Sequence, residues 1–147
     1  MSSHNRIEVM HGVNLDQLGR RDPKHYGSTT LDQLEQQVER EARDKGFSTR
    51  FFRTNHEGSF VERLHLLAGT ADAVILNPGA WTHYSWAIRD ALELTGLPAV
   101  EVHLSAVEER EEWRRVSVLD GVVKAKISGK GVSGYSEALE FLEGVLQ

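Results

Sequence analysis

The sequence predicts an α/β domain in which strands and helices alternate along the chain. Short runs of β-branched and other apolar residues, typical of buried strands, alternate with longer stretches whose apolar residues have helical spacing. At 147 residues the chain fits a single domain, residues 1–147, which can bury roughly two thirds of its unfolded surface. There is no internal repeat and no low-complexity tract.

Five short segments have the composition of strands. The segment DAVILN contains a continuous apolar run, which is typical of a strand buried on both faces of a sheet. A polar, glycine-containing loop, residues 11–28, follows the first strand, and loops of that length are often functional lids. The predicted strands are RIEVM (6–10), FSTRFFR (47–53), DAVILN (72–77), PAVEVHL (98–104) and VVKAKIS (122–128).

Four helices are expected between and after these strands. Thr30 and Gln33 have the spacing of a capping box, and Gly46 is placed to end the same helix. Gly96, with Pro98 behind it, is placed to close the third helix. The apolar residues expected on the buried faces are Leu31, Leu34, Val38 and Ala42 in the first helix, Phe60, Val61, Leu64, Leu67 and Ala68 in the second, Trp86, Ala87, Ala91 and Leu94 in the third, and Tyr135, Leu139, Leu142 and Leu146 in the last.

This alternation predicts a parallel sheet with right-handed crossovers and helices on both faces. A flavodoxin-like, doubly wound five-stranded sheet is the simplest arrangement. Ligands of such sheets bind outside the carboxyl ends of the strands, so the functional site is expected there. The first four strands all end in polar residues, which are His11, Asn14, Asn55, His56, Glu57, Asn77, Glu101 and His103.

Composition excludes several classes of protein. The sequence has no cysteine, which excludes disulfides and thiolate nucleophiles and suits a reducing cytoplasm. No stretch approaches about 20 apolar residues, so we expect a soluble, cytoplasmic protein that does not bind a membrane. The net charge is −5, with lysine and arginine spread along the chain, which argues against nucleic acid as a partner.

Motifs for cofactors, metals and covalent catalysis are missing as well. The sequence has neither GxGxxG nor GxxxxGK[ST], which disfavours flavin and nicotinamide nucleotides. His56, His83 and His103 lie on separate segments without the spacing of a metal site. No GxSxG elbow presents a nucleophile. Noncovalent proton transfer without cofactor or metal is the chemistry that remains.

Two arginine clusters, Arg20-Arg21 and Arg110-Arg114-Arg115, suggest a small anionic ligand. The loop segment GRRDPKHYG places Tyr26 close to the first cluster. A nearby guanidinium favours the phenolate form of tyrosine, which would make Tyr26 a strong base near neutral pH. The alternative is that Tyr26 packs under its loop while both arginines are solvated, and the spacing does not decide between the two.

Five stretches, in the order GVNLDQLGRRDPKHYG, NHEG, NPGAWTHYSWAIRDAL, VEVHLS and REEWR, match one known family. Through them the chain resembles the type II dehydroquinases (3-dehydroquinate dehydratases) over nearly its full length. The resemblance implies a hydro-lyase without cofactor or metal that assembles as a dodecamer of four trimers. Its reaction is the anti elimination of water from 3-dehydroquinate to 3-dehydroshikimate, in the shikimate pathway of aromatic amino acid biosynthesis.

The resemblance also implies roles for individual residues. Tyr26 is the base that removes the proton next to the ketone, and Arg21 favours its phenolate. His103 is the acid that protonates the departing hydroxyl, and Glu101 orients it. Asn14 holds the water that stabilises the enolate. The positions implied in substrate binding or in its support are Asn77, His83, Asp90 in a neighbouring subunit's site, the backbone at Leu104 and Ser105, Arg114 and Arg110.

Several positions depart from the family pattern. The family's first motif reads NGPNLNLLG, and Asp16 in particular adds a negative charge near a site for an anion. The alternatives left open are a paralogue acting on aminodehydroquinate or in quinate catabolism, and a catalytically silent anion-binding module. NHEG is expected to support the pocket, with Asn55 capping the second helix. The departures are His11, Val13, Asp16, Gln17 and Ala106.

Overall fold

The computed structural model describes residues 4–147 and shows a five-stranded sheet in the order β2-β1-β3-β4-β5. Every neighbouring pair of strands is parallel. This order is that of a flavodoxin-like, doubly wound sheet, so the predicted fold class is confirmed. The strands are β1 (Arg6–His11), β2 (Ser48–Arg53), β3 (Ala73–Asn77), β4 (Ala99–His103) and β5 (Ala125–Ser128).

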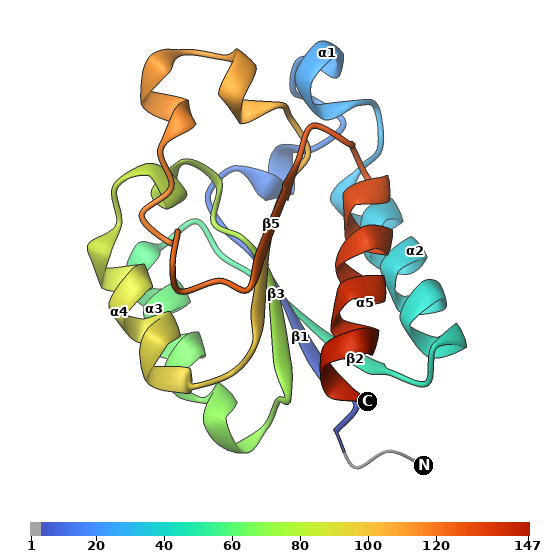
Figure 1. Cartoon of the computed structure of the whole chain (residues 1–147). Helices are drawn as coiled ribbons and strands as arrows, with labels where there is room; N and C mark the ends of the chain where they lie inside the picture. The colour runs from blue at the N-terminus through green and yellow to red at the C-terminus, as the bar shows by residue number, and fades with distance from the viewer. Residues whose placement is uncertain (1–3) are drawn as a thin grey trace.

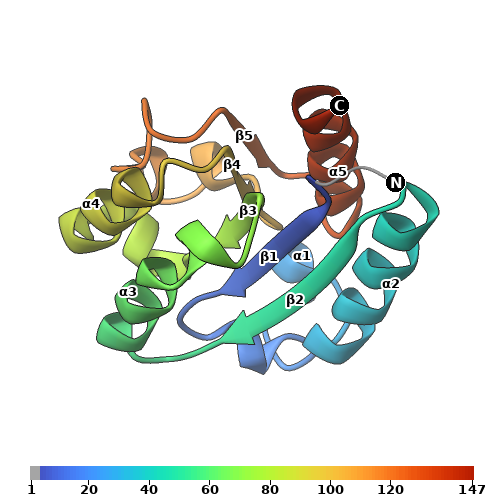
Figure 2. The same cartoon turned by 90° about the horizontal axis from the view of Figure 1, so that it is seen from below.

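Helices cover both faces of the sheet. Figures 1 and 2 show α2 (Leu31–Asp44) and α5 (Ser133–Leu146) on one face and α3 (Glu57–His65) and α4 (Trp86–Thr95) on the other. Successive side chains of β3 point to opposite faces. Ile75 therefore packs under α2 and α5, whereas Leu76 packs under α3 and α4.

Local signals fix the ends of two helices. In the capping box of α2, Oγ1 of Thr30 accepts from the N–H of Gln33 at 3.2 Å, and Oε1 of Gln33 accepts from the N–H of Thr30 at 3.0 Å. Gly96 follows α4 with a left-handed φ of 65°. Both features confirm the sequence prediction, because these boundaries depend on neighbouring residues alone.

The prediction for the buried face of α4 was confirmed for Ala91 and wrong for Trp86, Ala87 and Leu94. Trp86 and Leu94 are 63 % and 77 % exposed. The buried residues, Ile88, Ala91, Leu92 and Thr95, have the i, i+3, i+4, i+7 spacing of a helix face. The helix has two stripes with apolar residues, and the sequence alone does not show which one meets the sheet.

Strand β5 is also shorter than predicted. Val122 and Val123 lie in a turn, where their N–H groups donate to the carbonyl oxygen of Leu119. They pack against the core beside α4, so their apolar character reflects burial in a loop and not a place in the sheet.

Short helical turns lie above the carboxyl ends of the strands (Figure 1). They are η1 (Leu15–Gln17), α1 (Pro23–Tyr26), η3 (Gly79–His83), η4 (Val107–Glu109) and η5 (Glu112–Arg115). Within residues 4–147, no helix has both the length and the apolar character needed to cross a membrane.

Candidate active site

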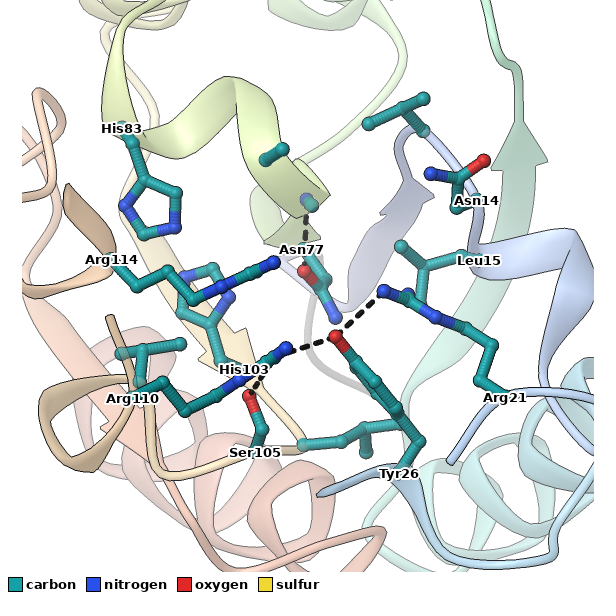
Figure 3. A pocket seen from close by; sticks show the side chains of 15 residues that line it. Asn14, Leu15, Arg21, Tyr26, Asn77, His83, His103, Ser105, Arg110 and Arg114 are labelled. Atoms are coloured by element: carbon teal, nitrogen blue, oxygen red, sulfur yellow. Dashed lines mark hydrogen bonds between the residues drawn. The ribbon is translucent and has the colours of Figure 1, made fainter. Parts of the chain in front are cut away.

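A pocket opens at the carboxyl ends of β1, β3 and β4, where the sequence predicts the site (Figure 3). Three of its lining residues are arginines, and none of these fifteen residues is acidic. The arrangement favours an anionic ligand. The lining residues are Val13, Asn14, Leu15, Arg21, Tyr26, Asn77, Gly79, Ala80, His83, His103, Leu104, Ser105, Val107, Arg110 and Arg114.

The hydroxyl of Tyr26 lies between two guanidinium groups (Figure 3). Nη2 of Arg21 and Nη1 of Arg110 each donate to it at 2.6 Å. The Arg21 guanidinium also lies 3.7 Å from the centre of the Tyr26 ring. Of the two readings of this loop, the structure shows the one in which an arginine contacts the phenol. The contact of Arg110 joins residues 84 positions apart, and local spacing gives no sign of it.

The clustered cations act on one another. Burial lowers the pKa of the Arg21 guanidinium; Tyr26 opposes this effect, and Arg110 and Arg114 add to it by repulsion. An anion between these side chains relieves their mutual repulsion. The electrostatics therefore favour an anionic group, such as a carboxylate on a ligand, between these arginines.

His103 is held by a buried carboxylate on its own strand. Glu101 precedes it by two residues on β4, so both side chains lie on the same face of the sheet. Nε2 of His103 lies 2.5 Å from Oε2 of Glu101. Burial raises the pKa of Glu101, but hydrogen bonds from His103 and two hydroxyls outweigh it and hold the pKa below its usual value.

Those two hydroxyls belong to Thr82 and Ser117, which sequence reasoning missed. The Thr82 hydroxyl donates to Glu101, and Oγ of Ser117 donates to Oε1 of Glu101 at 2.8 Å. A buried carboxylate requires donors of this kind. No local pattern marks which residues of η3 and of the segment after η5 supply them.

The two asparagines of the pocket are fixed in different ways. Oδ1 of Asn77 accepts from the N–H of Gly79 at 3.0 Å, so the amide nitrogen points into the pocket (Figure 3). Asn14 has a left-handed backbone, φ 69°, and its N–H donates to Oδ1 of Asn55 at 2.8 Å. The expectation that Asn55 caps α3 was wrong, because the N-cap is His56.

His83 and Arg114 converge on Trp113. Nδ1 of His83 lies 2.7 Å from the carbonyl oxygen of Val116, which requires the proton on Nδ1 and leaves Nε2 as an acceptor. Burial lowers the pKa of His83, the Val116 carbonyl opposes this, and His103 and Arg114 lower the pKa further. The Arg114 guanidinium lies 4.1 Å from the ring centre of Trp113.

The other residues implied by the resemblance fall into two groups. Leu104 and Ser105 follow β4 directly and line the pocket. Oγ of Ser105 accepts from Nη1 of Arg110 at 3.3 Å. Asp90 lies outside this pocket, exposed on α4.

Not every polar residue at a strand end reaches the pocket. His11 is fully buried, and its Nε2 lies 3.0 Å from Oε2 of Glu35 on α2. Asp16 accepts from Nδ2 of Asn55 at 3.0 Å and is not among the lining residues. The added charge of Asp16 is therefore held away from the anion site. Among residues 4–147, no three histidine, aspartate or glutamate side chains are grouped as metal ligands.

The model of one family, dehydroquinase class II, matches residues 5–143. The 3-dehydroquinate dehydratase of Syntrophotalea carbinolica is 46 % identical over 131 residues, 88 % of each chain. That of Thermotoga maritima is 45 % identical over 142 residues, 97 % of each chain.

Solved structures agree with these sequence matches. The type II dehydroquinase from Butyrivibrio crossotus superposes with a TM-score of 0.92 at 37 % identity, over 95 % of this chain and 98 % of that one. The type II dehydroquinase from Propionibacterium acnes gives a TM-score of 0.91 at 39 % identity, over 97 % of this chain and 99 % of that one. The chain belongs to the class II dehydroquinase family.

Proposed function

We propose that the protein is a 3-dehydroquinate dehydratase, a hydro-lyase that removes water from 3-dehydroquinate to give 3-dehydroshikimate. The observation that carries the proposal is that one pocket holds a tyrosine hydroxyl between two guanidinium groups and a histidine backed by a buried carboxylate. These are a base and an acid, the two groups that an elimination needs. The family membership supports the same reaction.

In the first step Tyr26, as phenolate, removes a proton from the carbon next to the ketone. The electrons of the broken C–H bond form an enolate, and the proton stays on the phenol. Arg21 and Arg110 stabilise the phenolate, because hydrogen bonds to an ionised acceptor are strong.

The enolate oxygen needs a donor that is already in place. Asn14 lines the pocket, and we assign it the water molecule that binds this oxygen. A preorganised donor of this kind lowers the barrier by about 3 kcal/mol.

In the second step the enolate collapses and the C–O bond to the β-hydroxyl breaks as His103 protonates the leaving group. Nδ1 is the ring nitrogen that serves the substrate, because Glu101 holds Nε2. The carboxylate accepts from Nε2 and so fixes the orientation of the ring.

We assign substrate binding to the polar groups around these two. The Arg114 guanidinium and the acceptor Nε2 of His83 suit ring hydroxyls, and Asn77 offers its amide nitrogen. The N–H groups of Leu104 and Ser105, beside Arg110, suit the carboxylate.

To test the reaction, purified protein is mixed with 3-dehydroquinate and the ultraviolet absorbance is followed, because the enone product absorbs there. We expect turnover without added metal or nucleotide. The Tyr26→Phe variant keeps the ring but loses the base, so its turnover should fall to background. An active Tyr26→Phe variant would contradict the mechanism, and inactivity of the unaltered protein on 3-dehydroquinate would contradict the function.

We also propose that the chain assembles as a trimer-based dodecamer in which Asp90 reaches a neighbouring subunit's site. Trp86, Asp90 and Leu94 are spaced i, i+4, i+8 along α4 and are all exposed. Two large apolar side chains on either side of a carboxylate suit burial against a second copy of the chain. Light scattering on the purified protein measures the number of subunits.

A further inference from the structure

Asn14 holds a backbone conformation that requires support. Among residues 4–147 it is the only residue other than glycine with a positive φ, at 69°. An L-residue tolerates this region at a cost, although asparagine tolerates it better than most. Its side chain makes no capping hydrogen bond to η1, so it does not secure the turn itself.

The support comes from the end of β2, which the mechanism does not use. The N–H of Asn14 donates to Oδ1 of Asn55 at 2.8 Å. Nδ2 of the same amide donates to Oδ2 of Asp16 at 3.0 Å. Asn55 therefore bridges two residues of the turn through both ends of its side chain.

The carboxylate of Asp16 dictates which way this amide faces. A flipped amide would place its NH₂ against the N–H of Asn14 and its oxygen against the carboxylate, so that both contacts repel. The negative charge accepts from Nδ2 only, and Oδ1 is thereby presented to Asn14. Asp16, which departs from the family pattern, thus determines the orientation of the Asn55 amide.

We propose that Asn55 is a positioning residue for Asn14, and that Asp16 fixes the orientation of its side-chain amide. This inference rests on the proposed function, in which Asn14 holds the water at the enolate oxygen. The hydrogen bond from this water to the substrate oxygen strengthens only as the enolate forms. A misplaced Asn14 should therefore lower kcat and leave KM nearly unchanged.

A double-mutant cycle tests the proposal. Asn55→Asp keeps an acceptor for the N–H of Asn14 but sets two carboxylates against each other. We therefore expect kcat to fall roughly tenfold, which corresponds to a rise of about 1.4 kcal/mol in the activation barrier. Asp16→Asn keeps a carbonyl acceptor for Nδ2 and should cost less. In the double variant the new amide at position 16 donates to the new carboxylate at position 55, which restores both contacts. We expect kcat to recover to within about threefold of the unaltered enzyme.

Thr54→Ala is the matched control. Oγ1 of Thr54 accepts from the N–H of His56 at 3.0 Å, at the same strand end but away from Asn14. This variant should lose thermal stability while keeping kcat. If Asn55→Asp behaves like Thr54→Ala, or if the double variant is no more active than Asn55→Asp, the positioning role is wrong.

Hydrogen exchange separates this inference from the proposed function. The peptide covering residues 12–17 should exchange faster in Asn55→Ala than in the unaltered protein, whatever reaction the enzyme catalyses. Unchanged exchange there would overturn the positioning of Asn14. Normal protection in a protein that is inactive on 3-dehydroquinate would instead contradict the function alone.

Discussion

Two arginines that are far from each other in the sequence both donate to the hydroxyl of Tyr26. Arg21 lies five residues before it, whereas Arg110 approaches from the loop after β4. The second contact ties the loop that carries Tyr26 to the loop that carries Ser105. The proposed base is therefore completed only when the two loops meet.

Arg110→Ala should lower kcat/KM by roughly 10- to 100-fold, because one hydrogen bond to a charged group contributes about 1.5–3 kcal/mol. Steady-state kinetics measures the loss. Arg115→Ala is the control, since Arg115 is exposed and does not line the pocket. Equal activity of the two variants would argue against a role for Arg110 at Tyr26.

Glu101→Gln should change how stability depends on pH. Its pKa is below the usual 4.5 in the folded state, so its ionisation stabilises the fold above that value. This contribution is lost as the pH falls through the lowered pKa. The unaltered protein should therefore lose more thermal stability than Glu101→Gln between pH 6 and pH 3, as melting curves will show. Parallel losses would contradict the assignment.

At the scale of the element, helix boundaries with local causes and the buried face of α2 were predicted, whereas the buried face of α4 was not. The capping box and Gly96 placed two helix ends from adjacent residues. The buried side of α4 depends on the sheet that it meets. Asn55 was predicted to cap α3, because its hydrogen-bond partner, Asn14, is 41 residues away in the sequence and could not be inferred.

Thr30→Ala should lower the free energy of unfolding by about 1 kcal/mol, because it removes the N-cap acceptor of α2. Chemical denaturation measures the change, and kcat should be unaffected. Ser28→Ala, in the exposed loop just before, is the control and should leave stability unchanged. A similar loss in both variants would mean that the loop, and not the cap, determines the effect.

At the scale of the whole molecule, the parallel sheet is what gathers the site. Asn14, Asn77 and His103 were predicted together because parallel strands end at one edge. Thr82 and Ser117 were not, because their positions follow from the paths of long connections, and Arg110 was expected at the site only through its arginine cluster and the family resemblance. The sequence thus predicted the place of the site and the partners Glu101 and Arg21, whereas the two hydroxyls that hold Glu101 were not predicted.

Leu94→Glu should break the assembly into smaller species, because it replaces one of the two large exposed apolar side chains beside Asp90 with a charge. Light scattering will report the mass, and activity should fall with it if Asp90 completes a neighbouring site. Val145→Glu, on the exposed side of α5, is the control and should leave the mass unchanged. An unchanged mass for Leu94→Glu would place the interface elsewhere.

The three arginines of the pocket belong to a protein with a net charge of −5. The molecule as a whole is therefore negatively charged, while the lining of this one opening carries three cations and no carboxylate. Low-dielectric walls focus such a field outward, so it acts on a diffusing carboxylate before any contact is made. Discrimination among metabolites thus begins during the approach through solvent, and neutral or cationic ring compounds gain no such guidance toward the catalytic groups.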